Sequence, residues 1–377
     1  MKNSIYMDYA ATTFIKKEVL EAMYPFLTEE YANTSSIYSF SSKSKMAVDN
    51  SRKNIAEAIN ADRDEIYFTA GGSESDNWAI IGTALANRKK GNHIITSEIE
   101  HHAVLNSCKY LEANGFRVTY LGVDSRGLIN LAELNDCISE DTILVSIMYA
   151  NNEVGTIQPI ESIGEICRNK KVIFHSDAVQ AVGNIPIDVK NSNIDLLSMA
   201  SHKFYGPKGV GALYIKKGTK IDSYIHGGAQ ERKKRAGTTN VAGIVGMGRA
   251  IEIAIDNMPS EYERLSQLRD KLITGLLKIK SSKLNGVEGS GRLPGNCNIS
   301  FENVEGDMLL AILDTYGIYA SSGSACSAGS IDPSHVLISM GLSKEMAKGS
   351  LRLTIGSKTS EEDILYVIEK VKDAVAR

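Results

Sequence analysis

The stretch KVIFHSDAVQ, residues 171–180, contains the pattern that decides the fold. Its first half, Val172–Ser176, is a short and mainly apolar run, typical of a strand buried inside a sheet. Asp177 follows directly at the end of this run. Ligands of an open parallel sheet bind at the carboxyl ends of its strands. The stretch therefore predicts a parallel strand that carries a carboxylate into a binding crevice, although an aspartate here can also cap the next helix.

Strand-like and helix-like segments alternate on both sides of this stretch. The predicted strands are Glu65–Thr69, His93–Ser97, Arg117–Leu121, Thr142–Tyr149, Val172–Ser176, Asp195–Met199 and Gly211–Ile215. The predicted helices that accompany them are Met46–Ile59, Glu74–Lys89, His102–Asn114, Asn130–Cys137 and Ile160–Asn169. Such alternation is typical of an α/β domain whose mostly parallel sheet is covered by helices on both faces.

The pattern changes after residue 255. Val241–Ile255 is predicted to be a helix, and Asn257–Ser260, which contains a proline, is predicted to interrupt the chain. Glu261–Lys280 then has leucines on one side, as in a long amphipathic helix. Further strands are predicted at Asn298–Phe301 and Leu351–Thr354, and further helices at Asp307–Tyr316 and Ser360–Ala376. We therefore expect a second, smaller α+β domain that begins near residue 258.

Composition and charge exclude several classes of protein. The 377 residues suggest two to three domains, and a net charge of −3 gives no basic character that would indicate nucleic-acid binding. The apolar runs are too short to span a bilayer, and the N-terminus lacks the apolar run of a signal peptide. Five cysteines show no CxxC spacing, so we expect free thiols and a cytoplasmic location.

Glycines follow the first predicted strand of the sheet, in the stretch FTAGGSESDN at residues 68–77. Gly71 and Gly72 allow the backbone to approach a ligand closely, and the free N–H groups of a helix N-terminus attract phosphate. Ser73 can add a hydroxyl to such a site, or can simply cap an ordinary helix. The stretch predicts a phosphate site only in combination with other motifs.

A lysine occupies a restricted position in SHKFYGPKG, residues 201–209. Lys203 comes just after a predicted strand and just before Gly206 and Pro207. A lysine that forms a Schiff base needs such placement, together with a lowered pKa. Asp177 would then balance the charge of a protonated pyridine ring. Most lysines in loops are simply exposed to water, so this position is again informative only in combination.

The fourth motif is SSGSACSAGS, residues 321–330, in which every neighbour of Cys326 is small. Small residues bury little apolar surface, so we expect an exposed and mobile thiol that can move between a substrate and an acceptor. A flexible loop that happens to contain a cysteine would show the same composition.

Together and in this order, the four motifs resemble those of cysteine desulfurases of the NifS/IscS kind, in the class V aminotransferase group of fold-type I pyridoxal-phosphate enzymes. The resemblance runs from MDYAATT, residues 7–13, to Ser350-Leu351-Arg352. It implies a large cofactor-binding domain at 14–258. It also implies a small α+β domain formed by 1–13 and 259–377, which carries the cysteine loop at about 321–334.

The resemblance also implies roles for single residues around the cofactor. Lys203 resembles the Schiff-base lysine and the base at Cα, and His101 the ring that stacks on the pyridine. Asp177 resembles the partner of the pyridine nitrogen, and Gln180 the donor to the phenolic oxygen. The positions that match the phosphate cradle are Gly72, Ser73, Ala200, Ser201 and His202. Many relatives have serine where Ala200 stands, so either Ser201 replaces that phosphate contact or one contact is missing.

Four further residues have roles implied by the resemblance. Asn152 and Arg352 match the groups that hold the substrate carboxylate, and Cys326 matches the nucleophile that receives sulfur as a persulfide. Thr238 matches a residue that reaches the phosphate of a neighbouring subunit, which implies a homodimer. Adjacent histidines at 101 and 102 have no further ligand at metal spacing, so we expect no metal.

The implied activity converts L-cysteine to L-alanine and passes the sulfur to an acceptor protein. Iron–sulfur cluster assembly, tRNA thiolation and DNA phosphorothioation all use such donors, and the sequence does not distinguish between them. A selenocysteine lyase or a related β-lyase is the alternative on the same scaffold. A non-catalytic sulfur carrier is the alternative from a different class.

Overall fold

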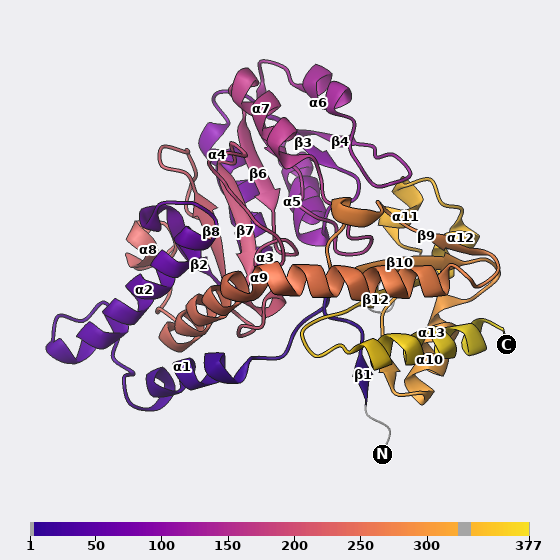
Figure 1. Ribbon diagram of the computed structural model, residues 1–377. Helices are drawn as coiled ribbons and strands as arrows, with labels where there is room; N and C mark the ends of the chain where they lie inside the picture. Colours follow the sequence, from indigo (N-terminus) through magenta and orange to yellow (C-terminus); the bar gives the residue numbers. More distant parts are fainter. Residues whose placement is uncertain (1–3, 323–332, 377) are drawn as a thin grey trace.

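A computed structural model describes residues 4–322 and 333–376 (Figure 1). Its main sheet has seven strands in the order β2-β8-β7-β6-β5-β3-β4, in which only β8 runs antiparallel to its neighbours. The strands are β2 Ile66–Thr69, β3 His93–Ser97, β4 Arg117–Leu121, β5 Thr142–Ser146, β6 Ile173–Asp177, β7 Leu196–Ala200 and β8 Gly211–Ile215. The predicted mostly parallel sheet is therefore confirmed, with strand ends within a few residues of those expected.

Helices cover both faces of this sheet (Figure 1). Successive side chains of a strand point to opposite faces. Ile95 and Val145 accordingly belong to one apolar cluster, and Ile94 and Leu144 belong to another. The helices are α1 Lys17–Thr28, α2 Ser42–Ala58, α3 Gly72–Asn77, α4 Thr83–Asn87, α5 His102–Ala113, α6 Leu131–Cys137, α7 Ile160–Lys170, α8 Gln230–Lys233, α9 Val241–Leu276, α10 Gly306–Thr315, α11 His335–Ser339, α12 Lys344–Lys348 and α13 Glu361–Val375.

Helix α9 runs without interruption from Val241 to Leu276 and crosses most of the molecule (Figure 1). The predicted interruption at Asn257–Ser260 is therefore wrong. Proline removes one backbone hydrogen bond from a helix, but packing at both ends of a long helix compensates for this loss. Met247 and Ile251 pack in the core beside the main sheet, and Leu265 and other residues of the second half pack in a separate core.

The second core is built on a three-stranded antiparallel sheet in the order β12-β10-β9. Its strands are β9 Ser282–Leu284, β10 Asn296–Phe301 and β12 Ser350–Thr354. Apolar side chains from α9, α10 and α13 cover it. Residue 258 thus lies inside one helix that contributes to both cores, and the division of the chain at this point stays a prediction.

The N-terminal segment belongs spatially with the C-terminal region. Strand β1, Ile5–Tyr6, pairs in parallel with β11, Ile318–Tyr319, and Met7 is fully buried in the second core. None of the helices within the described ranges is long and apolar enough to cross a membrane.

Candidate active site

Ten of the residues that the sequence singled out line a single cavity of about 290 Å³. They are Gly72, Ser73, His101, Asn152, Asp177, Gln180, Ala200, His202, Lys203 and Arg352. Asp177 and Ala200 are the last residues of the parallel strands β6 and β7. The cavity therefore lies at the carboxyl ends of the sheet strands, where ligands of such sheets bind.

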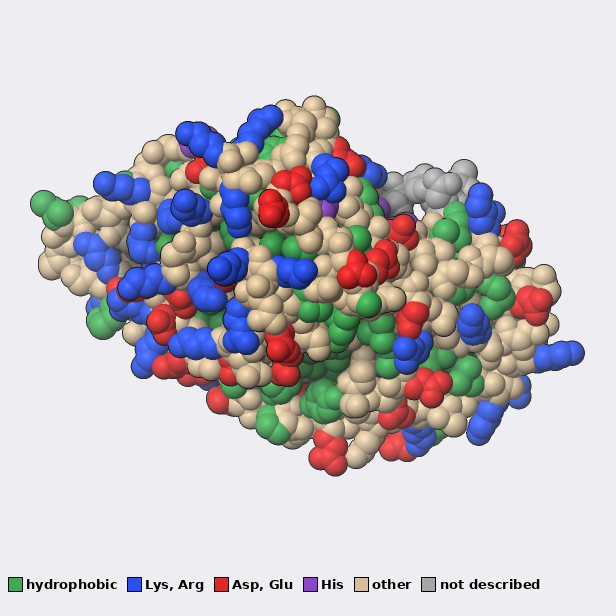
Figure 2. All heavy atoms as spheres, turned by 90° about the horizontal axis from the view of Figure 1, so that it is seen from above, with side chains coloured by type: hydrophobic (Ala, Val, Ile, Leu, Met, Phe, Trp, Pro, Cys, Tyr) green, Lys and Arg blue, Asp and Glu red, His purple; other side chains and the backbone are tan. Residues whose placement is uncertain are grey.

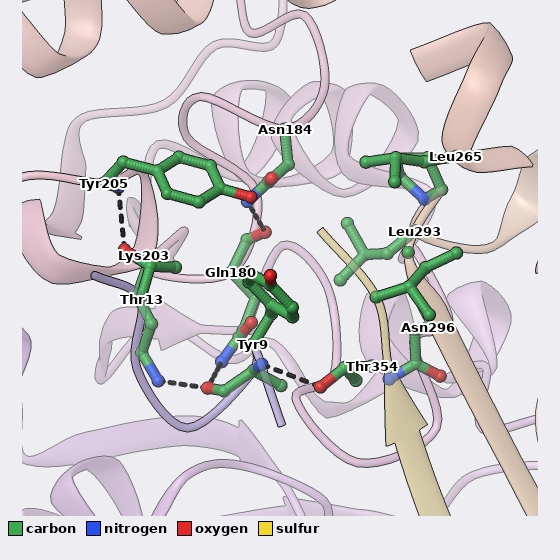
Figure 3. Close-up of a pocket in the computed structure, with 14 residues that line it drawn as sticks. Tyr9, Thr13, Gln180, Asn184, Lys203, Tyr205, Leu265, Leu293, Asn296 and Thr354 are labelled. Atoms are coloured by element: carbon green, nitrogen blue, oxygen red, sulfur yellow. Dashed lines mark hydrogen bonds between the residues drawn. The ribbon is translucent and has the colours of Figure 1, made fainter. Parts of the chain in front are cut away.

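Lys203 ends a short 3₁₀ turn, Ser201–Lys203, that follows β7 directly. Its Nζ atom donates hydrogen bonds to the carbonyl oxygens of Ala10 and Ala11, in the N-terminal segment (Figure 3). Gly206 is required nearby, because a Cβ atom there would lie 2.0 Å from the Ser201 hydroxyl oxygen. The turn thus holds the Lys203 amine at the cavity. Its backbone is fixed by close packing between Ser201 and Gly206.

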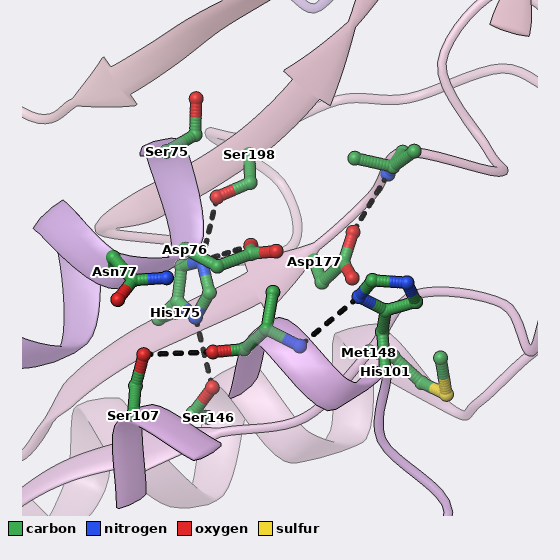
Figure 4. A network of polar contacts seen from close by, with 12 residues as sticks. Ser75, Asp76, Asn77, His101, Ser107, Ser146, Met148, His175, Asp177 and Ser198 are labelled. Carbon is green, nitrogen blue, oxygen red and sulfur yellow. Dashed lines mark hydrogen bonds and ion pairs between the residues drawn. The ribbon is translucent and has the colours of Figure 1, made fainter. Parts of the chain in front are cut away.

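Asp177 and His101 both line the cavity, and their side chains lie near each other (Figure 4). Asp177 is 6% exposed, and its Oδ1 accepts a hydrogen bond from Val179 N at 3.0 Å. Burial raises the pKa of this carboxyl, and the neighbouring His101 opposes the rise. His101 caps α5 by accepting from Ala103 N, and burial lowers its pKa. A neutral imidazole and a buried carboxyl group therefore both border the space for a ligand.

The N-terminus of α3 opens toward the same cavity. Its first residues are Gly72 and the exposed Ser73, and no side chain caps the N–H groups of this helix start. A Cβ atom on Gly72 would lie 2.7 Å from Val179 Cγ2, so glycine permits the close approach. Burial lowers the pKa of nearby His202 to about 4, which keeps its ring neutral. An uncapped helix start of this kind favours a phosphate.

These features fit pyridoxal phosphate. The amine of Lys203 suits the aldehyde, the buried carboxyl of Asp177 suits the protonated ring nitrogen, and the start of α3 suits the phosphate. His101 adds an aromatic ring to the lining of the cavity, close to Asp177 (Figure 4).

Arg352 brings a guanidinium group to the cavity from β12, although its side chain is only 2% exposed. Its Nη1 donates to the carbonyl oxygen of Asn152 at 3.2 Å, and its Nη2 to Asp8 Oδ1 at 2.8 Å. Its Nε has no hydrogen-bond partner among the described residues. Buried N–H donors of this kind suit a carboxylate ligand. The contact of Asn152 with Arg352 is made by its backbone carbonyl.

The sequence did not single out Asp8, although it lies within the MDYAATT stretch that carries the resemblance. The sequence also did not single out the buried polar side chains of His175 and Asp76, which lie near Asp177 (Figure 4). His175 contacts Ser146 Oγ at 2.8 Å and Ser198 Oγ at 3.0 Å, and burial lowers its pKa to about 3. Asp76 lines the cavity, and burial together with Asp177 raises its pKa. Strand pairing and the packing of α3 bring these groups together, so no local pattern could have shown them.

Glu100 belongs to the same buried region and gives a prediction about stability. It is 0% exposed, and burial raises its pKa to about 8, while bonds from Ser97 Oγ and Met148 N partly oppose the rise. An acid whose pKa rises on folding loses stability as pH rises from its unfolded pKa toward its folded pKa. Glu100→Gln removes this loss. We therefore expect the unfolding free energy of the variant, relative to that of the wild type, to increase by about 3 kcal/mol from pH 6 to pH 9.

Chemical denaturation of both proteins at the two pH values measures this difference. Glu98→Gln, which removes an exposed carboxyl two residues away, is the matched control and should show little change. An equal pH dependence for Glu100→Gln and the wild type would contradict a raised pKa at Glu100.

Two predicted site residues that the structure describes, Ser201 and Thr238, do not line this cavity. The Ser201 hydroxyl is buried without a hydrogen-bond partner among the described residues, and Ala200 lines the cavity in its place. The two alternatives for the phosphate contact, replacement by Ser201 or one missing contact, therefore both stay predictions. Thr238 lines a different pocket, with Ala70, Gly209 and other residues. Cys326 lies outside the described residues.

Within the described ranges, no group of three His, Cys, Asp or Glu side chains is close enough to hold a metal ion.

Comparisons with known proteins agree on the family of this chain. The family model described as aminotransferase class-V matches residues 5–367. A protein of Clostridium botulinum (strain Hall) named cysteine desulfurase IscS is 59% identical over 371 residues, which cover 98% of this chain and 94% of that protein. A protein of the same name from Methanosarcina thermophila is 56% identical, over 99% of this chain and 92% of that protein.

Two solved structures show how closely the folds agree. A structure titled "NIFS-LIKE PROTEIN" superimposes with a TM-score of 0.93 at 39% identity, over 99% of this chain and 100% of that chain. A structure titled "SspA in complex with cysteine" has a TM-score of 0.84 at 39% identity, over 93% of this chain and 99% of that chain.

Proposed function

The chain belongs to the aminotransferase class-V family, and from this membership we propose that it is a pyridoxal-phosphate-dependent cysteine desulfurase. It converts L-cysteine to L-alanine and transfers the sulfur to Cys326 as a persulfide. The observation that carries this proposal is that Lys203, Asp177 and Arg352 line one cavity in a chain 59% identical to a protein of that name. A lysine, a carboxylate and a guanidinium are the groups that a cofactor ring and an amino acid need.

Residues of this chain would hold the cofactor in three places. Lys203 holds its aldehyde, Asp177 its ring nitrogen, and Gly72 with Ser73 its phosphate, at the start of α3. His101 would cover the ring. When bound, pyridoxal phosphate withdraws electrons from the Cα atom of an amino acid.

The protein side chains contribute binding and proton transfer. Arg352 orients the substrate through its carboxylate, which directs the Cα–H bond toward Lys203. The amine of Lys203 accepts the Cα proton as a general base. The thiolate of Cys326 then attacks the substrate sulfur, so that an S–S bond forms while the Cβ–S bond breaks. The electron pair of the broken bond stays with carbon, which gains a proton and leaves as alanine.

Incubation of the purified protein with L-cysteine tests this proposal. We expect alanine to form, and mass spectrometry of the trapped protein to show one added sulfur atom on Cys326. A protein that binds the cofactor but forms no alanine would contradict the proposal and favour a non-catalytic sulfur carrier. Faster turnover of L-selenocysteine without a persulfide on Cys326 would favour the alternative of a selenocysteine lyase.

The sulfur acceptor is the part of the proposal that depends most on the relatives. The name IscS refers to iron–sulfur cluster assembly, so we propose an iron–sulfur scaffold protein as the acceptor and the cytoplasm as the location. Trapping the Cys326 persulfide with its acceptor in cell extract would test this. Recovery of a tRNA or DNA modification enzyme in place of a scaffold would contradict the proposed acceptor, and recovery of the protein from an exported fraction would contradict the location.

We also propose that the enzyme is a homodimer. Large apolar side chains are exposed along α1, the connection that follows it and the start of α2, namely Leu20, Tyr24, Leu27, Tyr31, Ile37, Tyr38, Phe40 and Met46. Figure 2 shows hydrophobic side chains at the left end of the molecule, which carries the connection from α1 to α2 in Figure 1. Thr34 in this connection bonds to Thr239 at 3.1 Å, so the apolar surface lies beside Thr238.

Exposed apolar patches of this kind mark protein interfaces, and a second copy placed here would bring its Thr238 toward a neighbouring phosphate site. Sedimentation equilibrium should give twice the chain mass. A mass equal to one chain at micromolar concentration would contradict the dimer.

A further inference from the structure

Residues 7–13, here called the N-terminal strap, connect the two sides of the active-site cavity. On one side, Met7 N donates to Tyr319 O and Thr354 N donates to Met7 O, both at 2.7 Å. On the other side, Thr13 N donates to His202 O at 3.0 Å, and Thr13 Oγ1 accepts from Tyr205 N at 2.9 Å. The strap is therefore fixed at both ends, to β11 and β12 and to the turn that carries Lys203.

The middle of the strap contacts the catalytic machinery directly (Figure 3). The carbonyl oxygen of Ala10 accepts from Lys203 Nζ and from Gln180 Nε2, the latter at 3.0 Å. Ala10 N donates to Thr354 Oγ1 at 2.9 Å. One short segment therefore sets the separation between the lysine on the main sheet and strand β12 on the smaller sheet.

Asp8 extends this connection to Arg352. The backbone of Asp8 forms a parallel bridge with Thr354, and Arg352 stands two residues earlier on the same face of β12. The Asp8 carboxylate consequently meets Arg352 Nη2 at 2.8 Å, with the Asp8 side chain 19% exposed and that of Arg352 2% exposed. A buried guanidinium has little contact with water, so its orientation depends on the groups that bind its N–H donors.

The remaining N–H groups show what this contact achieves. Nη1 is bound to Asn152 O, whereas Nε is buried and has no partner among the described residues, although Arg352 lines the cavity. An arginine has five N–H donors and can bind two carboxylates at different edges. Asp8 and Asn152 thus hold two of the three nitrogens and leave the third as a donor for a ligand.

We propose that Asp8 is a positioning residue, which orients Arg352 so that the guanidinium binds the α-carboxylate of the amino-acid substrate. This inference rests on the proposed function, in which Arg352 binds that carboxylate. Two effects oppose each other when Asp8 is removed. Repulsion between Asp8 and the substrate carboxylate disappears, but among the described residues only the Asn152 carbonyl still anchors the Arg352 side chain. Small displacements of a binding group have large effects on affinity and rate, so loss of orientation should exceed the relief of repulsion.

A pair of ligands that differ by one carboxylate tests the proposal on the cofactor-loaded enzyme. L-alanine carries the carboxylate, and ethylamine is the same molecule without it. We expect Asp8→Ala to raise the Kd of L-alanine, measured by calorimetry, roughly tenfold, the equivalent of one charge-assisted hydrogen bond. The Kd of ethylamine should change less than about twofold, because ethylamine has no group for Arg352 to bind. Asp8→Asn keeps a hydrogen-bond acceptor and should stay within about threefold of the wild type for both ligands.

Each other outcome would overturn the proposal. Tighter binding of L-alanine to Asp8→Ala would make Asp8 a competitor of the substrate. Equal weakening of both ligands would make Asp8 a residue that only supports the fold. If Asp8→Ala does not fold, Asp8→Ser provides the same comparison, because its short hydroxyl cannot reach Nη2 from the same backbone position.

Asp195 offers a matched control. It pairs with Lys216 at 3.1 Å and its side chain is 21% exposed, close to the 19% of Asp8, but it does not line the cavity. Asp195→Ala should leave the ratio of the two Kd values unchanged. The ligand comparison needs no sulfur chemistry, so failure of the wild type to form alanine from L-cysteine would refute the desulfurase function alone. An unchanged ratio in Asp8→Ala, with normal desulfuration in the wild type, would refute the positioning role alone.

Discussion

Lys203→Ala protein should lose both its visible absorption band and its ability to form alanine from L-cysteine. The band requires a covalent bond between the cofactor aldehyde and the Lys203 amine, and the reaction requires the same amine as the base at Cα. Loss of a nucleophile that is also the general base should lower kcat/KM by at least about 10³-fold. Absorption spectra of the purified variant and a coupled alanine assay measure the two effects.

Lys217→Ala provides the control for this experiment, because Lys217 is exposed just after β8 and does not line the cavity. It should keep the absorption band and the full rate. A Lys203→Ala protein that keeps the visible band would place the Schiff base on another lysine. The Ala10 and Ala11 carbonyls also lose a donor in Lys203→Ala, so a slightly lower Tm is expected and does not bear on the assignment.

Cys326→Ser protein should separate cofactor binding from sulfur transfer. It should keep the visible band, because the Lys203 site is intact, but release of sulfide in the presence of a reductant should fall by about 10³-fold or more. A serine hydroxyl stays protonated near neutral pH and is a much weaker nucleophile toward sulfur than a thiolate. Mass spectrometry should find no added sulfur atom on the variant.

Cys137→Ser is the matched control, since Cys137 in α6 is partly exposed and remote from the proposed chemistry. It should behave as the wild type in both assays. Full-rate sulfide release by Cys326→Ser would refute the assignment of the nucleophile. Together, Lys203→Ala and Cys326→Ser distinguish a protein that lacks its bound cofactor from a protein that keeps the cofactor but lacks the thiol that receives the sulfur.

Much of the fold was predictable because the strands of the main sheet are buried on both faces and therefore read as short apolar runs. β6 and β7 end within one residue of the positions expected from their sequence. The interruption predicted at Pro259 was wrong because tertiary packing outweighs local propensity there. Local propensity favours a break there, whereas packing of α9 against two separate cores favours a continuous helix.

The candidate site also contains residues that the sequence could predict and contacts that it could not. The sequence could place Lys203 and Asp177 at one cavity because Asp177 ends a strand, Lys203 closely follows the adjacent strand, and the carboxyl ends of adjacent parallel strands meet at one edge of a sheet. The contact between Asp8 and Arg352 joins residues 344 positions apart, and no local pattern contains it. The same holds for the buried carboxyl of Asp76, which lies beside Asp177 only because α3 packs on the ends of the strands (Figure 4).

The amino-acid sequence by itself determined the class of fold and the family, and it predicted the cofactor-binding lysine and carboxylate, since these depend on periodicity and on short motifs within single segments. Only the tertiary structure decided which groups share the cavity, which carboxyls are held there with raised pKa values, and which N–H of Arg352 is left for a ligand. The physical reason is that burial, pKa and hydrogen-bond partners are properties of the space between segments, and that space is set by how the strands, α9 and the N-terminal strap pack together.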